Sequence, residues 1–385
     1  MSYIIHASAP TVLYDNPASV HNYAGWPSVT QLRDGRLAAV YSGFRLQHVC
    51  PFGKSVMQIS ENEGETWSLP MPVIDTLLDD RDSGICAFGK SSVIVTSFNN
   101  TPSFQRATNE VRRKQYASEN TEEYLKCHQS SPLAACDYVE AYLKYAEAQP
   151  DTLKHLGSTF RISNDNGVTF GDIHTIPVSS PHGPLELPDG TLYYVGTRYA
   201  TKQESDTDTE IDAYRIFPDG TYEKVCTVAR SDKLFLCEPH AILLPSGKII
   251  VHIRVQQFKN IGEPCFTVYQ CESTDGGKSY TEPHRILGQF GGSPAHLYLA
   301  PDGTLMSVYG YRVKPYGLRV MFSRDEGETW DTDNILYAEE CTSDLGYPCT
   351  TALKDGSFLT VFYAHGGDNT PALIRQIKWT FEYRA

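Results

Sequence analysis

Charged and ionisable side chains recur beside the strand-like segments of this chain, and their types suggest a site for an anion. A guanidinium group presents its N–H donors in a planar fork, which suits a carboxylate held by two parallel hydrogen bonds. Any one of these residues could equally form a surface ion pair or cap a turn, so their recurrence carries the argument. The arginines are Arg45, Arg81, Arg198, Arg254 and Arg312, and the histidines are His182, His240 and His296.

The segments that would bring these side chains together are repeated along the chain. An apolar run ends in a Gly-containing turn and a second apolar run follows, which is typical of a β-hairpin because Gly adopts the positive φ that the turn requires. The sequence therefore predicts six copies of one antiparallel unit. The turns occupy residues 32–35, 187–190, 244–247, 300–303 and 353–356, with a degenerate copy at 88–90.

The turn glycines are evenly spaced except in one interval. From Gly190 to Gly356 they lie 57, 56 and 53 residues apart, and Gly35 and Gly89 lie 54 residues apart. Between Gly89 and Gly190 the interval is 101 residues, about one repeat plus 46 more. Most of the segment 100–156 is rich in Glu, Lys, Ala, Leu and Tyr, a composition that favours helices. We therefore expect a helical insertion at 100–156, within the second repeat.

A second motif, Ser-x-Asp-x-Gly-x-Thr-Trp with variants, falls in step with the repeats. It occupies residues 60–67, 163–170, 273–280 and 323–330, with Asn62 in the Asp position of the first copy. In such a turn the Asp side chain accepts backbone N–H bonds and the aromatic side chain packs beneath. These copies resemble the Asp boxes (BNR repeats) of the sialidase (neuraminidase) superfamily, and the resemblance covers the chain apart from the insertion.

The resemblance implies an all-β fold, a six-bladed β-propeller made by residues 1–385, with a small helical insertion in blade two. An N-terminal strand at about residues 4–13 would close the last blade. The Asp boxes would lie on the outer rim and carry no chemistry. Residues just before the first strand of each blade, and at the end of the second strand, would converge on one mouth of the central channel.

The sialidase pattern can be transferred to single positions of this sequence. Glu238 precedes the first strand of blade four, and Arg254 ends the second strand of that blade, as in the family. Tyr347, in Gly-Tyr-Pro-Cys at the start of blade six, matches the family's nucleophile, with Glu238 as its base. A neutral phenol avoids the repulsion that a carboxylate nucleophile would meet from an acidic sugar. Arg312 of blade five would bind the substrate carboxylate with Arg254.

Two positions depart from the sialidase pattern. Trp26 stands where sialidases carry an Arg before the first strand of blade one. The loop that follows the second strand of this blade also lacks the Asp that acts as general acid in the family. Arg45 or Arg81 could replace the missing Arg, and Asp82 or His48 could replace the missing acid.

The sequence leaves three hypotheses for function. The first is an exo-acting glycoside hydrolase that releases a terminal acidic sugar, sialic acid or a related ulosonic or uronic acid, with retention of configuration through Tyr347. The second is a histidine-based glycosidase or lyase acting on another terminal sugar. The third is a non-catalytic carbohydrate-binding propeller, which the missing Arg and Asp favour and the Tyr347–Glu238 pair opposes.

The first hypothesis assigns a role to each candidate residue. The predicted catalytic residues are Tyr347, Glu238, Asp82 and His48. The predicted substrate-binding residues are Arg45, Arg81, Arg254, Arg312, His182, His240, His296 and Tyr311.

Composition narrows the classes of partner. The 385 residues carry 33 basic and 46 acidic side chains, a formal net charge of −13, which disfavours nucleic acid as a partner. The sequence shows no secretory signal, no apolar run long enough to cross a bilayer and no C-x-x-C pair among its ten cysteines. We expect a cytoplasmic protein without cofactor or metal that binds a glycan or acidic sugar and no membrane. The tyrosine-rich insertion favours a homo-oligomer.

Overall fold

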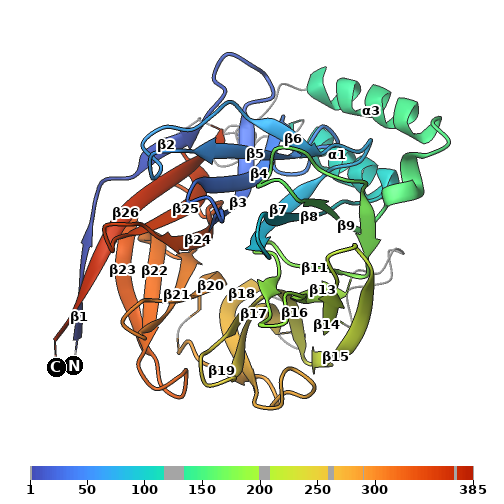
Figure 1. Cartoon of the computed structure of the whole chain (residues 1–385). Coiled ribbons are helices and arrows are strands. Elements are labelled where there is room, and N and C mark those ends of the chain that lie inside the picture. Colours follow the sequence, from blue (N-terminus) through green and yellow to red (C-terminus); the bar gives the residue numbers. More distant parts are fainter. Residues whose placement is uncertain are drawn as a thin grey trace.

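The computed structural model describes residues 2–116, 134–198, 209–258, 264–288, 290–367 and 371–384. Their strands form six antiparallel sheets of four or five strands each. The sheets are arranged as a ring around a common axis, with the innermost strand of each sheet toward the centre (Figure 1). The six antiparallel repeats predicted from the hairpin turns, and the six-bladed propeller that the resemblance implies, are therefore confirmed.

The first three blades follow the chain from the inside outward. Blade one contains β3 (Tyr23–Gln31), β4 (Leu37–Arg45), β5 (Lys54–Ser60) and β6 (Met71–Ile74). Blade two contains β7 (Arg81–Phe88), β8 (Ser92–Phe98), β9 (Ser158–Ser163) and β10 (His174–Ile176). Blade three contains β11 (Val178–Ser179), β12 (Leu185–Glu186), β13 (Leu192–Arg198), β14 (Glu210–Ile216) and β15 (Tyr222–Arg230).

The last three blades complete the ring. Blade four contains β16 (Leu234–Leu243), β17 (Ile249–Phe258), β18 (Pro264–Ser273) and β19 (His284–Arg285). Blade five contains β20 (Gly292–Leu299), β21 (Leu305–Tyr311), β22 (Tyr316–Ser323) and β23 (Asp331–Glu340). Blade six contains β24 (Gly346–Ala352), β25 (Phe358–His365) and β26 (Ala372–Arg384), and also β1 (Ser2–Ala7) and β2 (Thr11–Tyr14) from the start of the chain.

The two termini meet in blade six. Strand β1 pairs antiparallel with β26 from Ser2 opposite Arg384 to Ala7 opposite Trp379. On the inner side of this pairing, Tyr3 stacks on Phe322 of blade five with ring centroids 4.0 Å apart. An apolar cluster that includes Phe358 and Trp379 continues into blade five. The first and last strands of the chain thus share one sheet, which joins the two ends of the ring.

The innermost strand of blade three differs from the others because it is split into β11 and β12. The five residues between them include Pro181, Gly183 and Pro184, of which the prolines carry no N–H for a strand ladder. Gly183 has a φ of +81° and packs so closely against blade two that an added Cβ would lie 2.8 Å from the backbone nitrogen of Ile85.

The hairpin turns match the geometry expected from their sequence. In the turn between β12 and β13, Gly190 has a φ of +82° and donates its N–H to the carbonyl of Leu187. Asp189 accepts a hydrogen bond from the backbone N–H of Thr191. These turns all lie at the end of the innermost strands opposite to the candidate site.

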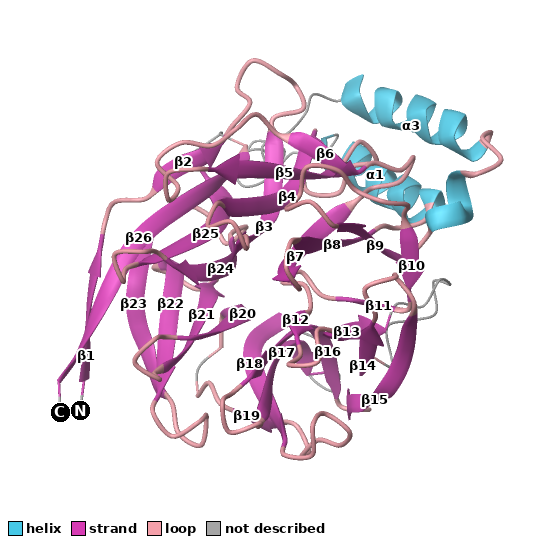
Figure 2. Ribbon diagram, in the orientation of Figure 1, coloured by secondary structure: helices cyan, strands magenta, loops and turns pink. Residues whose placement is uncertain are grey.

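Among the described residues, helical structure occurs only in the connection between β8 and β9 of blade two (Figure 2). It consists of α1 (Pro102–Tyr116), α3 (Ala134–Glu147) and a 3₁₀ turn (Thr152–His155), and residues 117–133 of the insertion lie outside the described part of the chain. No described helix is long and apolar enough to span a membrane. The helices lie on the outside of the ring, beside blades one and two (Figure 1).

The Ser-x-Asp turns lie between the third and fourth strands of blades one, two, four and five. In the copy of blade five, Asp325 accepts hydrogen bonds from the backbone N–H and the hydroxyl of Thr329 and from the hydroxyl of Ser323. The polar groups of the turn are thus hydrogen-bonded within the turn itself.

Candidate active site

The innermost strands of blades one, two, four and six share an irregularity where they begin. In each of these strands two residues have no partner on the second strand of the blade. In blade one these are the residues between Gly25 and Ser28, and the same interruption occurs at the corresponding point in the other three blades. At each point a residue with a side chain has a positive φ: Trp26 (55°), Asp82 (52°), Glu238 (48°) and Tyr347 (50°). This conformation costs a non-glycine residue about 1–3 kcal/mol, and such strain concentrates at functional sites. Three of the four residues are predicted catalytic residues.

Tyr347, Glu238 and Arg254 form a closely bonded group at the centre of the site. The phenol Oη of Tyr347 donates a hydrogen bond to Oε1 of Glu238 at 2.5 Å. Nη1 of Arg254 donates to Oε2 of Glu238 at 2.5 Å and to Oη of Tyr347 at 3.1 Å. The structure therefore brings together the three residues that the sialidase resemblance selects from blades four and six.

Strands of neighbouring blades hold Tyr347, Glu238 and Arg254 in place. Glu238 and Arg254 come from adjacent strands, because Cys237, next to Glu238, is the cross-strand partner of Arg254. The N–H of Glu238 donates to Oγ1 of Thr197 in blade three. Arg254 and Tyr347 are buried, whereas the side chain of Glu238 keeps 18% of its surface exposed. Solvent, and hence a ligand, can reach the carboxylate that holds the phenol.

Electrostatics keep the phenol protonated before any reaction. Burial raises the pKa of Tyr347 well above its usual value, the negative charge of Glu238 adds to this, and Arg254 opposes it. The phenol can therefore lose its proton only as it reacts, and Glu238 is the acceptor already in contact.

Asp82 supplies a second titratable group to the same region. Its carboxyl group is buried, and Nε of Arg81 lies 3.5 Å from Oδ1. Burial raises the pKa of Asp82 to about 7, with Arg81 opposing and the Glu238 charge reinforcing the shift. The charge of Asp82 in turn raises the pKa of Tyr347. Asp82 is thus a carboxylic acid that stays largely protonated up to neutral pH beside a Tyr–Glu pair.

Arg312 supplies a second cation close to Tyr347. Its guanidinium carbon is 5.9 Å from the centroid of the Tyr347 ring, and it donates to the carbonyl of Ser343 at 3.3 Å. The ring of Phe266 lies 5.0 Å from the Arg254 guanidinium and 5.5 Å from that of Arg312. Phe266 has a φ of +46°, and sequence patterns did not single it out. It separates two cations that would otherwise repel each other.

The predicted histidines come together but form a cluster of their own. The ring centroids of His182, His240 and His296 lie 4.3–5.3 Å apart. His182 and His296 are buried, and burial lowers the pKa of all three rings well below the usual value. Nδ1 of His240 accepts the N–H of Leu297 and Nδ1 of His296 accepts that of Thr350, so the proton of each neutral ring is on Nε2. None of the three rings makes a hydrogen bond, an ion pair or a ring contact with Tyr347 or Glu238.

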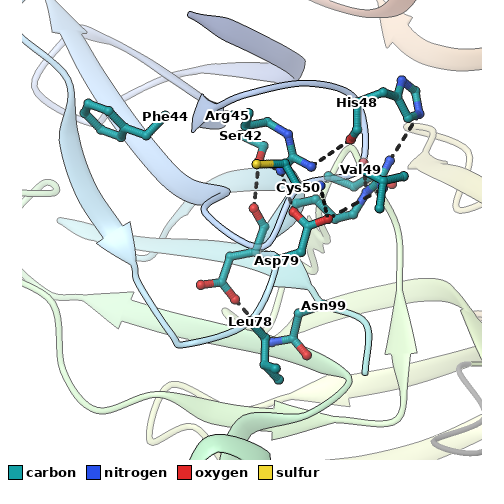
Figure 3. Close-up of polar contacts among 12 residues, drawn as sticks. Ser42, Phe44, Arg45, His48, Val49, Cys50, Leu78, Asp79 and Asn99 are labelled. Carbon is teal, nitrogen blue, oxygen red and sulfur yellow. Dashed lines mark hydrogen bonds and ion pairs between the residues drawn. The ribbon is translucent and has the colours of Figure 1, made fainter. Parts of the chain in front are cut away.

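Arg45 is placed differently from the prediction that it contacts substrate. Its side chain is fully buried, 2.6 Å from Oδ1 of Asp79, and donates to Ser42 Oγ and to the carbonyl of His48. Figure 3 shows Arg45 and Asp79 at the base of the loop that carries His48. Because its donors are used inside the protein, Arg45 holds this loop and leaves no face for a ligand.

Three further residues that the sequence singles out make no hydrogen bond or ion pair with Tyr347 or Glu238. Arg198 pairs with Glu210 at the surface, 2.8 Å away. Tyr311 packs under the guanidinium of Arg319, 4.4 Å from the ring centroid. His48 lies next to Trp26, with ring centroids 4.9 Å apart and perpendicular.

The helical insertion supports the His48 loop. Gln105 of α1 donates to Oδ2 of Asp79 at 2.9 Å, and Arg112 donates to the carbonyl of Val49 at 3.2 Å. Tyr138 and Tyr142 of α3 pack on Phe52, with ring centroids 4.8 and 4.6 Å away. Two of the tyrosines that favoured self-association therefore contact the chain's own loop.

The described residues contain no group of three or more His, Cys, Asp or Glu side chains placed to hold a metal ion. For His240 and His296 the tautomers give a reason, because each ring accepts an N–H bond at Nδ1, carries its proton on Nε2 and so has no free lone pair for a metal.

By sequence, the chain matches no protein-family model and no curated protein. By structure, it is similar to a Dyadobacter fermentans protein of unknown function, with a TM-score of 0.73 and 18% identity over 98% of this chain and 99% of the other. The NanB sialidase of Streptococcus pneumoniae matches with a TM-score of 0.61 and 13% identity over 97% of this chain and 70% of the other. The chain has the sialidase fold.

The same fold occurs in a glycosidase for a neutral sugar. The GH93 α-L-arabinofuranosidase of Fusarium graminearum matches with a TM-score of 0.60 and 11% identity, over 97% of each chain. At these identities the similarity establishes the sialidase fold, and the chemistry has to be argued from the side chains of the site.

Proposed function

We propose that this protein is a retaining exo-glycoside hydrolase that releases a terminal acidic sugar. The observation that carries the proposal is the 2.5 Å hydrogen bond from Tyr347 to Glu238, with Arg254 donating to both. A binding protein has no need of a phenol held against a carboxylate. Similarity of fold to a sialidase and an arabinofuranosidase supports a glycosidase.

In the first step, Oη of Tyr347 attacks the anomeric carbon while its proton passes to Glu238. Asp82 gives its proton to the glycosidic oxygen, so the bond to the leaving group breaks and the aglycone departs as an alcohol. Arg254 stabilises the negative charge that develops on Oη. The product of this step is a sugar linked covalently to Tyr347.

In the second step, a water molecule loses a proton to Asp82, now a carboxylate, and attacks the anomeric carbon. The bond to Oη breaks, and Glu238 returns the proton to the phenolate. Both carboxyl groups end in their starting protonation states, and two inversions at the anomeric carbon give retention.

Arg254 and Arg312 favour an acidic sugar, because both guanidinium groups lie close to Tyr347. Trp26 occupies the position of the third arginine of the sialidase pattern, so the clamp has two members. We therefore place a uronic or ulosonic acid other than the commonest sialic acid among the substrates to test first. The buried, neutral histidines offer no support for histidine-based chemistry.

The test is release of 4-nitrophenol from aryl glycosides of sialic, glucuronic and ulosonic acids and of arabinofuranose. Tyr347→Phe is compared with Tyr41→Phe, which removes a buried phenol hydroxyl that bonds Gln58 in blade one. We expect the first variant to lose at least about 10³-fold in kcat and the second to keep its rate. Equal turnover by Tyr347→Phe would remove Tyr347 from the nucleophile role. Sugar binding without any turnover by the wild type would favour a binding propeller.

A further inference from the structure

The carboxylate of Asp344, in the loop before β24, is the centre of a polar network beside the candidate site. Its Oδ1 accepts the hydroxyl of Tyr363 at 2.8 Å and lies 3.2 Å from Nδ1 of His48. Its Oδ2 accepts the hydroxyl of Tyr23 at 3.0 Å and Nε2 of His365 at 3.2 Å. Four donors from blades one and six thus surround one carboxylate, which has about four lone pairs to offer.

The network keeps Asp344 ionised and its partners in the donor state. Burial alone would raise the pKa of Asp344, but His48 and His365 hold it well below its usual value, through their charge when protonated and through the N–H bonds that they donate to it. Burial and the Asp344 charge raise the pKa of Tyr23 and of Tyr363 well above theirs. Both phenols therefore keep their protons and donate them to Asp344.

This arrangement fixes the tautomer of His48. The Tyr23 hydroxyl donates its only proton to Asp344, so Nδ1 of His48, 3.0 Å from the Tyr23 oxygen, must be the donor there and toward Asp344. In the neutral ring, Nε2 then carries a lone pair. Nε2 lies 3.5 Å from Nη2 of Arg81, which is a donor only.

Arg81 connects this network to the acid of the site. Its guanidinium lies over the ring of Trp26, 4.1 Å from the centroid, and Nε is 3.5 Å from Oδ1 of Asp82. Nη1 is 4.0 Å from Asp79, the residue that also anchors Arg45 and the His48 loop. Arg81 thus lies between a histidine lone pair and the carboxyl group proposed as general acid.

We propose that Asp344 and His48 are positioning residues that hold Arg81 beside Asp82, and that protonation of His48 releases Arg81 and suppresses hydrolysis at low pH. The inference rests on the proposed function in assigning the acid role to Asp82. The geometry of the relay, from Asp344 through His48 to Arg81, stands on its own contacts.

The direction of the pH effect follows from the charges that face His48. Asp344 is the anion against it, Arg81 and Arg45 are the cations, and Tyr23 is a neutral phenol. Burial lowers the pKa of His48 below its usual value, Asp344 opposes this, and both arginines add to it. The ring is therefore neutral near pH 7, and an imidazolium formed at lower pH would face the Arg81 cation.

The experiment combines a pH profile with nuclear magnetic resonance. Below the pKa of His48, kcat/KM of the wild type should fall about tenfold for each pH unit. His48→Gln keeps a hydrogen-bond acceptor for Arg81 without the titration, so it should lose this acid limb. Asp344→Asn removes the anion that raises the pKa of His48, so its acid limb should move to lower pH. Asp212→Asn, which removes a buried carboxylate paired with Lys224 in blade three, should leave the limb in place.

The histidine ring itself provides a readout that needs no turnover. With ¹⁵N-labelled histidine, the His48 signals, assigned by their loss in His48→Gln, should show the Nδ1–H tautomer at pH 7 and a lower pKa in Asp344→Asn. An Nε2–H tautomer, an unchanged pKa in Asp344→Asn, or an acid limb that persists in His48→Gln would overturn the relay. If the wild type hydrolyses no glycoside, the proposed function fails, and the resonance data still decide whether the relay exists.

Discussion

The two halves of the candidate site are built differently. On the nucleophile side, Tyr347 and Glu238 touch directly, and Arg254 bonds both. On the acid side, Oδ1 of Asp82 makes no hydrogen bond to any described residue, and its neighbours act through charge at 3.5 Å or more. Short hydrogen bonds hold the nucleophile side in place. The acid side is positioned by burial of Asp82 and by the charged residues around it, Arg81 first.

The difference matches the tasks that the two halves would perform. A phenol nucleophile needs a base in contact, because its own pKa is far above neutral pH. A general acid needs a pKa near the working pH, and burial without a strong hydrogen bond achieves this for Asp82. The nucleophile side brings together Tyr347, Glu238 and Arg254, the residues that the resemblance selects, whereas the proposed acid, Asp82, comes from another position of the blades.

The largest effect is expected from Glu238→Gln on the nucleophile side. Without the base, attack by Tyr347 is slowed whatever the leaving group, so kcat should fall by about 10⁴-fold on nitrophenyl and alkyl glycosides alike. The measurement is kcat on both substrate types, with folding checked by thermal unfolding.

A matched control for Glu238→Gln is Glu340→Gln, which breaks another ion pair with a buried carboxylate, 2.7 Å from Arg375. A similar loss of kcat in this control would mean that breaking any buried ion pair lowers the activity, and that the effect of Glu238→Gln is not specific to its role as a base. Loss of activity on alkyl glycosides only would assign Glu238 to the acid role.

Asp82→Asn should show a smaller effect that depends on the leaving group. An alkyl leaving group needs its oxygen protonated, so kcat should fall by about 10³-fold, whereas nitrophenolate departs unaided and the loss should be about tenfold or less. Equal losses on both substrates would contradict the assignment of Asp82 as the acid.

The pH profile sharpens the same assignment. The acid must carry its proton, and the pKa of Asp82 is raised to about 7, so kcat/KM of the wild type on alkyl glycosides should decline as pH rises through about 7. Asp82→Asn should lack this basic limb. A basic limb that survives the substitution would belong to another group.

The smallest effect is expected from Arg312→Gln. Its guanidinium is close to Tyr347 but outside the Glu238 contact, so it should contribute to binding of a sugar carboxylate more than to the chemical step. We expect KM to rise about tenfold for an acidic sugar and to stay unchanged for arabinofuranoside, at little cost to kcat. An equal rise for both sugars would indicate that Arg312 shapes the site without recognising charge.

The fold was predictable because a propeller repeats its local chemistry. Turn glycines at regular intervals mark six hairpins, and a helical composition marks the one long interval. Tyr347, Glu238 and Arg254 were predictable because the sialidase resemblance assigns roles to these positions at strand ends. A recurring signal was also present, because Trp26, Glu238 and Tyr347 each precede a proline at the start of an innermost strand.

The rest depends on contacts that position alone does not give. Arg45 ends a strand as Arg254 does, yet Asp79 draws its side chain into the interior. Asp344 and His48 lie 296 residues apart in sequence and meet only because blades one and six are neighbours in the closed ring. Sequence spacing places residues at a strand end, and the surrounding charges decide where each side chain points.

The most direct test of the central claim is covalent trapping. An acidic sugar with an activated leaving group and a fluorine that slows the second step should accumulate the glycosyl-enzyme, and peptide mass spectrometry then identifies the labelled residue. We expect the added sugar mass on the peptide that contains Tyr347, absent in Tyr347→Phe and reduced in Glu238→Gln. A label on Glu238 or Asp82 would contradict it, because the nucleophile would then be a carboxylate.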